Sequence, residues 1–244
     1  MIRLNPALDV EALSREYALK GRLQIRDVLE PQSANEIHDV LASRTPWWTA
    51  FNEGDQVRQL SPEQAARLSP QQQQQMLLAI QRGAKAGYQY HYHFCPLHAE
   101  YFRAGAPRGP LFDFYEFLNS PAAMDFFRRL TGLPAMWADA QGTLYRSGNF
   151  LKSHSDADSP RNRLAAYVFN FTRDWERDWG GYLQFFNERH DIEEAYRPIF
   201  NAVNIFTVPM DHSVGIVAPF AKANRYSITG WLRPGPPPGP IGLQ

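Results

Sequence analysis

The sequence predicts an α+β protein in which an N-terminal helical layer supports a C-terminal antiparallel β barrel. Helical periodicity occurs in patches over residues 1–140, whereas from residue 141 onward short β-rich runs follow one another with no helical pattern between them. Such a succession indicates a sandwich or barrel and not β-α-β units. We therefore expect a support region integral to the same domain (1–140), a barrel core (141–233) and an irregular proline- and glycine-rich tail (234–244).

Four segments of the support region carry helical signals: 9–19, 31–43, 61–87 and 120–134. Asp9 is positioned to cap the first segment. The third segment is expected to form one or two helices, with a break near Pro70. The last begins at Ser120 and is closed by Gly132. The five-glutamine run in the third segment indicates a solvated helix face, because glutamine is a good helix former.

Strand signals consist of short apolar or aromatic runs between turn residues. One lies in the support region, over residues 21–30. The others follow residue 141 and read GTLYRSG, RLAAYVFNFT, GGYLQFF, AVNIFTVP, HSVGIVAP and RYSITGWL. Their β-branched and aromatic content is typical of strands in a sandwich or barrel.

The run YQYHYHF has two interpretations. His91 and His93 repeat an H-x-H spacing that could bind metal. The alternating aromatic residues Tyr88, Tyr90 and Tyr92 instead predict a half-buried strand, which we favour.

Bulk properties exclude several classes of function. Lys+Arg and Asp+Glu both total 25, so a net charge of zero disfavours nucleic-acid and anionic-membrane partners. The single cysteine, Cys95, excludes an internal disulfide and any multi-cysteine metal site. The N-terminal residues contain acids and no apolar run, so we expect no signal peptide, no membrane span and a cytoplasmic location.

The strongest chemical signal lies in the β-rich half. His154 and Asp156 are one residue apart, so on an extended strand their side chains share a face. With His212, they offer two imidazoles and one carboxylate. This set suits ferrous iron with open positions for other ligands, and zinc would also accept it.

A second signal lies at the start of the last strand. Arg225 and Ser227 share a face there, and a guanidinium beside a hydroxyl is a good receptor for a carboxylate deep in a barrel.

Together, Y145-x-x-G148, H154-x-D156, H212 and R225-x-S227 resemble the iron(II)- and 2-oxoglutarate-dependent dioxygenases. The runs RLAAYVFNFTRDWERDWGGYLQFF and FNAVNIFTVPMDHSVGIVAPFAKANRYSITGWL are similar to the prolyl hydroxylase branch, especially to the enzymes that act on a small-subunit ribosomal protein and their bacterial relatives. The resemblance spans roughly residues 20–233 and implies a double-stranded β-helix (jelly-roll) barrel.

The resemblance also implies roles for residues of the site. His154, Asp156 and His212 match the iron ligands, with no further catalytic residue implied. Four positions match contacts to 2-oxoglutarate. They are Arg225, which pairs with the distal carboxylate, and Tyr145, Ser227 and Asn170. Asn170 departs from the family, whose members commonly carry tyrosine there, although an amide can still donate a hydrogen bond.

The implied reaction is hydroxylation of an unactivated C–H, coupled to decarboxylation of 2-oxoglutarate to succinate. It requires Fe(II), 2-oxoglutarate and dioxygen, with ascorbate as an optional stimulant. The branch favours a prolyl residue of a protein or peptide as substrate, and a free amino acid or other small molecule is the alternative. A non-catalytic or zinc-binding barrel is the alternative outside oxygenase chemistry.

A nucleic-acid demethylase of the same superfamily is the less favoured enzyme class, because Trp231 stands where that subgroup carries a second arginine. We expect substrate selectivity to come from loops at the barrel mouth, within residues 45–60, 85–110 and 172–182.

Overall fold

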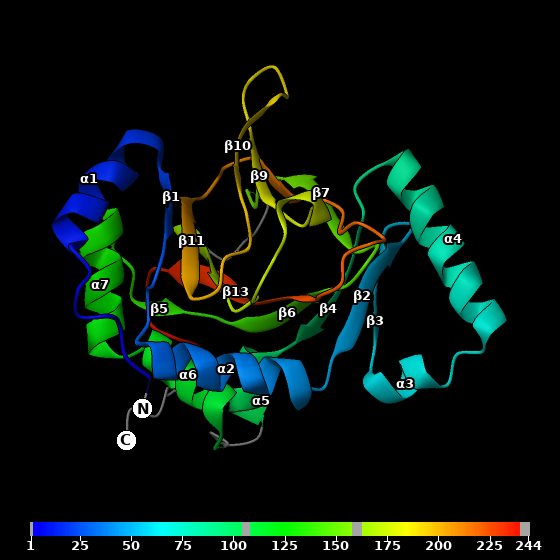
Figure 1. Cartoon of the computed structure of the whole chain (residues 1–244), viewed down its shortest axis with the longest axis horizontal. Helices are drawn as coiled ribbons and strands as arrows, with labels where there is room; N and C mark the ends of the chain where they lie inside the picture. The colour runs from blue at the N-terminus through cyan, green and yellow to red at the C-terminus, as the bar shows by residue number, and fades with distance from the viewer. Residues whose placement is uncertain (1, 104–107, 158–162, 240–244) are drawn as a thin grey trace.

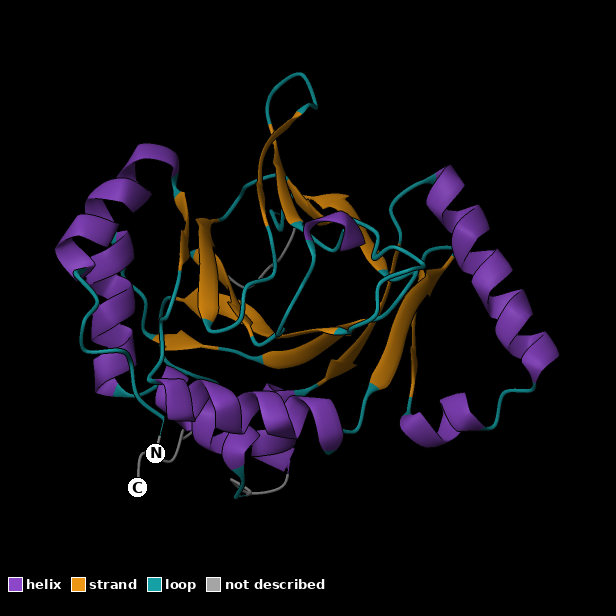
Figure 2. Ribbon diagram, viewed as in Figure 1, coloured by secondary structure: helices purple, strands orange, loops and turns teal. Residues whose placement is uncertain are grey.

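One curved antiparallel sheet organises the residues that the computed structural model describes, which are 2–103, 108–157 and 163–239 (Figures 1 and 2). Its strands are β1 Arg22–Ile25, β2 Trp48–Glu53, β3 Gln56–Leu60, β4 Tyr90–Cys95, β5 Trp137–Ala138, β6 Gln141–Tyr145, β7 Phe150–His154, β8 Ala165–Asn170, β9 Leu183–Phe186, β10 Ile192–Tyr196, β11 Ala202–Thr207, β12 His212–Val214 and β13 Arg225–Arg233. The main path runs β1-β11-β8-β13-β6-β4-β7-β12-β9-β10, and the predicted jelly-roll, double-stranded β-helix fold is confirmed.

Strand β4 connects the two layers of the barrel. Its second half, His93–Cys95, pairs with β6, whereas Tyr90 and His91 pair with β7. The hairpin β2–β3 extends the sheet from β4 through a further antiparallel pairing. Strands of the support region are thus hydrogen-bonded into the same sheet as the barrel core.

Helices surround this sheet on two sides and at its base (Figure 1). They are α1 Val10–Lys20, α2 Pro31–Ser43, α3 Pro62–Ala66, α4 Pro70–Ala86, α5 Leu97–Arg103, α6 Pro110–Leu118 and α7 Pro121–Thr131, with a short 3-10 turn at Arg177–Trp179. Among the described residues, no helix is long and apolar enough to cross a membrane.

The predicted helix boundaries follow from local capping. The Asp9 carboxylate accepts the backbone N–H of Ala12, and the Ser120 hydroxyl accepts that of Ala123. Gly132 ends α7 in the left-handed conformation at φ 70°. The third segment forms two helices, because Ser69 caps a new helix that starts at Pro70.

Helices α5 and α6, the hairpin β2–β3 and the strands β5 and β10 were not predicted. Helices α5 and α6 are short and rich in aromatic residues, which are poor helix formers. They form because Tyr101, Phe114 and Tyr115 are buried in the core beneath the sheet. The prediction of a loop within residues 45–60 was wrong, since this segment forms most of the hairpin β2–β3. Residues 234–239 contain no helix or strand, and the rest of the tail lies outside the described residues.

Gly230 in β13 is required where two strands come together. A Cβ at this position would lie 2.0 Å from the backbone oxygen of Asp139 and 2.7 Å from the Tyr167 hydroxyl. We predict that Gly230→Ala lowers the free energy of unfolding by about 2–3 kcal/mol, because the backbone cannot move aside freely. Gly87→Ala is the control, as nothing lies within 4 Å of its added Cβ. Urea unfolding of both variants tests this, and equal effects would contradict it.

Candidate functional site

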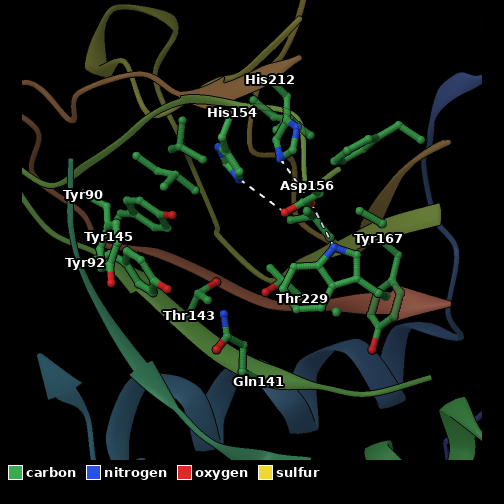
Figure 3. Close-up of a pocket in the computed structure, with 18 of the residues that line it drawn as sticks. Tyr90, Tyr92, Gln141, Thr143, Tyr145, His154, Asp156, Tyr167, His212 and Thr229 are labelled. Atoms are coloured by element: carbon green, nitrogen blue, oxygen red, sulfur yellow. Dashed lines mark hydrogen bonds and ion pairs between the residues drawn. The ribbon is translucent and has the colours of Figure 1, made fainter. Parts of the chain in front are cut away.

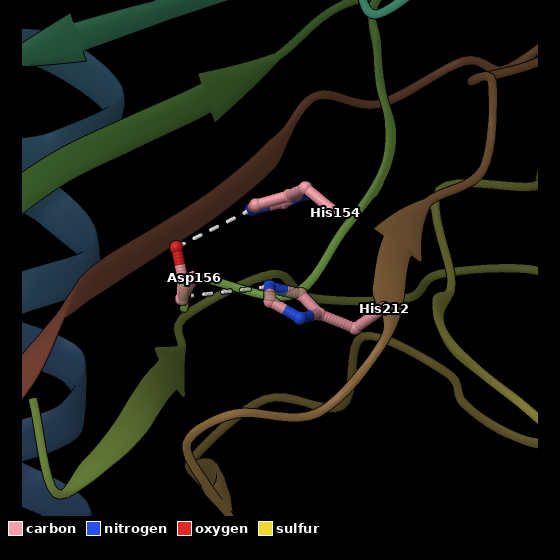
Figure 4. Close-up of side chains that lie close together, drawn as sticks. All are labelled: His154, Asp156 and His212. Atoms are coloured by element: carbon pink, nitrogen blue, oxygen red, sulfur yellow. Dashed lines mark ion pairs between the residues drawn. The ribbon is translucent and has the colours of Figure 1, made fainter. Parts of the chain in front are cut away.

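The two histidines and the aspartate are brought together by strand pairing (Figure 4). His154 ends β7 and lies opposite His212, the first residue of β12, in the antiparallel register. Asp156 follows β7 with a left-handed backbone at φ 62°, a conformation that aspartate tolerates better than most residues. One ligand atom from each side chain lies within 4.8 Å of the others. The described residues therefore bring together the two histidines and the aspartate named from the sequence, in a group that could hold a metal ion.

Backbone carbonyls orient both imidazole rings. His154 Nδ1 lies 3.0 Å from the Lys152 oxygen, and His212 Nδ1 lies 2.8 Å from the Met210 oxygen. Because a carbonyl can only accept, each Nδ1 carries a proton, and in the neutral form of each ring Nε2 keeps its lone pair. The Nε2 atoms lie 3.6 and 3.8 Å from the Asp156 carboxylate oxygens. Both rings thus present the free nitrogen that a metal requires.

The third ligand, Asp156, is held from the side away from the histidines. The Arg163 guanidinium donates to one carboxylate oxygen at 2.8 Å, and the Trp231 indole N–H donates to the other at 2.9 Å. Arg163 also stacks on the Trp231 ring, with its Cζ 3.7 Å from the centroid. Neither residue was predicted as part of the site.

Electrostatics keep His212 in the neutral form. Burial, and then the neighbouring imidazole of His154, lower the pKa of His212 to about 4. At neutral pH the ring is therefore uncharged and available to a cation.

Arg225 lies in the same cavity and is buried, with 2% of its surface exposed. Its Cζ lies 4.9 Å from the centroid of the Tyr145 ring, and Tyr145 is its partner in the β13–β6 register. Burial lowers the pKa of Arg225, yet an arginine stays charged. Its Nε has no hydrogen-bond partner, and a side-chain hydrogen bond joins the guanidinium to Tyr145. Among the described residues it forms no ion pair with a carboxylate. A buried, unpaired cation of this kind fits the carboxylate of a bound ligand.

The cavity that joins these groups has a volume of about 330 Å³ (Figure 3). It extends from Tyr88, which is 49% exposed, to the buried Arg225. Among the described residues that line it, the acidic, lysine and arginine side chains are Asp156, Arg163 and Arg225. The cavity therefore combines a metal-binding triad, one unpaired cation and largely uncharged walls.

Ser227 and Asn170 do not line this cavity, although both were predicted to contact the co-substrate. Ser227 is fully buried, and its hydroxyl lies 2.7 Å from that of Thr143, which does line the cavity. The Asn170 amide donates to the Val168 carbonyl at 3.2 Å. Thr143 thus stands between Ser227 and the cavity, and it was not predicted because its role depends on this pairing across strands.

The H-x-H pair lies on the predicted strand and plays no part in a metal cluster of the described residues. His91 contacts the Asn149 amide at 3.2 Å, and His93 contacts the Thr49 hydroxyl at 3.1 Å. Burial lowers the pKa of His91 to about 4. Burial, followed by the charge of Arg146, lowers that of His93 to about 3. Both histidines are neutral at neutral pH, His91 as a buried residue and His93 as a half-buried one.

Comparison with known proteins agrees with this geometry. Residues 140–233 match the family model of the 2OG-Fe(II) oxygenase superfamily. This segment contains the triad and Arg225. No curated protein matches the sequence.

Solved structures share the fold at low sequence identity. A prolyl-4-hydroxylase from Pseudomonas putida is 15% identical with a TM-score of 0.60, over 93% of this chain and 100% of that one. A prolyl hydroxylase from Trichoplax adhaerens, in complex with a hypoxia inducible factor peptide fragment, is 18% identical with a TM-score of 0.58, over 92% and 90%. The α-ketoglutarate-dependent epimerase of nogalamycin biosynthesis is 12% identical with a TM-score of 0.57, over 94% and 82%. The fold is thus shared by enzymes of different reactions.

The lowered pKa values of His91 and His93 make the free energy of unfolding depend on pH. Their folded pKa values lie below the ordinary histidine value of about 6.5, so below that pH the unfolded chain binds more protons. Their contribution is fully present above about pH 6.5 and is lost as the pH falls toward 4. We predict that the His91→Gln, His93→Gln double variant loses less stability over this range than the wild type. Urea unfolding of metal-free protein at pH 7 and pH 4.5 measures this, and parallel losses would contradict it.

Proposed function

Because the chain carries the barrel of the 2OG-Fe(II) oxygenase superfamily over residues 140–233, we propose that it hydroxylates a prolyl residue of a protein or peptide. The family uses Fe(II), 2-oxoglutarate and dioxygen. The observation that carries the proposal is the presence, in one cavity, of the triad and the unpaired cation of Arg225. A metal and a dicarboxylate can therefore bind side by side.

Each residue has a defined task in this proposal. His154, Asp156 and His212 would hold the iron through two Nε2 atoms and a carboxylate oxygen, a ligand set that suits ferrous iron. Arg225 binds the distal carboxylate of 2-oxoglutarate, and Tyr145 packs against the guanidinium. When bound, the iron supplies the oxidising chemistry that no side chain can perform. The barrel walls orient the substrate and exclude water.

The charges of the cavity favour a peptide over a free amino acid. A free amino acid needs an acid for its ammonium group, and Asp156 is the sole carboxylate among the described residues that line the cavity. That carboxylate is already engaged by Arg163 and Trp231. An ammonium group would therefore lose its hydration without gaining a partner, which is costly. A residue within a peptide carries neither terminal charge.

Structural neighbours support the prolyl substrate. The Pseudomonas putida and Trichoplax adhaerens proteins are prolyl hydroxylases, and the latter is in complex with a peptide fragment. The same fold in an epimerase means that the substrate must be tested directly.

We predict succinate formation from 2-oxoglutarate by protein loaded anaerobically with Fe(II) and then exposed to oxygen. Turnover should rise when proline-containing peptides are added, and the peptide should gain one oxygen atom by mass spectrometry. The same peptides with alanine in place of proline are the control. Absence of turnover, together with absence of 2-oxoglutarate binding, would overturn the proposed function.

Two substitutions separate metal binding from co-substrate binding. His154→Ala should abolish iron binding and turnover while the circular dichroism spectrum is retained, because the ring is replaced at a strand end. Arg225→Ala should chiefly weaken 2-oxoglutarate binding by about 1.5–3 kcal/mol, the value of a charge-assisted contact. Calorimetric titration with metal and with 2-oxoglutarate measures both. Full activity in either variant would contradict the assignment.

Trp231→Phe should weaken metal binding without removing a ligand. The variant keeps an aromatic ring but loses the N–H that holds one Asp156 oxygen. Loss of such a supporting contact typically lowers metal affinity about 10- to 100-fold. Competition with a chelator of known affinity measures the change. Trp179→Phe, at a tryptophan outside the cavity lining, is the matched control and should leave metal affinity unchanged.

A further inference from the structure

A row of four tyrosines forms one wall of the cavity, and three of them come from outside the matched segment. Successive ring centroids are 5.9 Å apart from Tyr88 to Tyr90, 5.5 Å to Tyr92 and 5.4 Å to Tyr145. Figure 3 shows Tyr90, Tyr92 and Tyr145 together on one side, across from the part of the wall around Thr229. The alternation along β4 and the residues before it places Tyr88, Tyr90 and Tyr92 on one face.

The inner and outer halves of this row differ in what they can contact. Tyr92 and Tyr145 stack on each other at 18°, and Tyr145 also packs against the Arg225 guanidinium. These two rings therefore surround the buried end of the cavity. Across the cavity, one face of Trp231 is covered by Arg163. Tyr88, which is 49% exposed, and the half-buried Tyr90 retain accessible ring surface at the mouth.

The outer half of the row also lies beside the metal triad. The Tyr88 ring centroid is 5.6 Å from that of His154. A group that packs on Tyr88 and Tyr90 is therefore held close to the first metal ligand. Burial raises the pKa of both phenols, so at neutral pH the rings are uncharged.

The backbone between these two tyrosines is fixed by a buried amide. The Gln89 side chain accepts from the Asn52 N–H and donates to the Asn52 carbonyl, each at 2.9 Å. The backbone carbonyl of Gln89 accepts the backbone N–H of Lys152, a residue of β7, at 3.1 Å. Gly83 leaves the space that Gln89 fills, since a Cβ there would lie 2.6 Å from the amide nitrogen. The surface is thus held in place before any ligand binds.

We infer that Tyr88 and Tyr90 form the surface on which the reacting residue of the substrate packs, and that this surface selects an uncharged, saturated ring within a peptide. The inference rests on the proposed function. Electron-rich ring faces attract the weakly positive C–H groups beside an amide nitrogen, and a neutral wall offers nothing to a charged side chain. Both tyrosines lie outside residues 140–233. Selectivity therefore comes from the support region, and the barrel core supplies the metal and co-substrate site.

The test measures binding without turnover. Protein is loaded with Zn(II) and 2-oxoglutarate and titrated with N-acetyl-L-proline methylamide by NMR. Tyr88→Ala and Tyr90→Ala should each raise the dissociation constant of this probe about three- to tenfold, and Tyr88→Phe and Tyr90→Phe should leave it within about twofold. Phe220→Ala, at an aromatic residue that is 63% exposed and outside the cavity lining, is the matched control. The dissociation constant of 2-oxoglutarate should be unchanged in all five.

A second measurement needs no variant. In the wild-type complex, the pyrrolidine protons of the probe should shift upfield because they lie over aromatic rings, and N-acetyl-L-lysine methylamide should bind more weakly. Alanine variants that bind the probe as the wild type does would overturn the tyrosine surface while leaving the proposed function intact. A wild-type protein that binds 2-oxoglutarate but not the prolyl probe would overturn the prolyl substrate, and the inference with it. Failure to bind 2-oxoglutarate would overturn the oxygenase itself.

Discussion

The site depends on the antiparallel pairing of β7 with β12, which sets His154 directly opposite His212. A shift of one residue in either strand would turn one imidazole to the other face of the sheet. Asp156 follows the same strand end with a left-handed backbone, and its carboxylate oxygens lie 3.6 and 3.8 Å from the Nε2 atoms of the two rings. Sheet register therefore fixes all three ligands at once.

The second constraint is the burial of a cation at the far end of the cavity. A guanidinium without a carboxylate partner is a destabilising feature in a folded protein, and it persists here beside the ring of Tyr145. The protein thus contains a buried charge that no carboxylate of the described residues neutralises. The cavity contains the buried Arg225 at one end, the triad, and the uncharged rings of Tyr88 and Tyr90 at its mouth. In the proposed reaction these three parts would bind the co-substrate, the metal and the substrate.

Spacing along single strands was enough to single out His154 with Asp156, and Arg225, from the sequence. Ser227, chosen by the same spacing, does not line the cavity. Residues that act through pairing between distant strands were not predicted. Thr143 is one example, and Arg163 is another, because its contact with Asp156 is a tertiary contact that strand periodicity does not predict. The sequence did contain a signal for Trp231, because alternation along β13 places this residue on the same face of the strand as Arg225. Helices α5 and α6 were missed because core burial outweighs their weak propensities.

Because β4 pairs with both β6 and β7, the barrel cannot be separated from the support region without loss of strand pairing. The matched segment of the superfamily begins after β4, yet β4 supplies backbone partners to both β6 and β7. A chain cut down to that segment would leave both strands with open edges, which invite pairing between molecules. The segment that matches the family model is thus not a self-contained sheet in this protein. Changes in the strand that completes it alter the cavity wall and the barrel closure together.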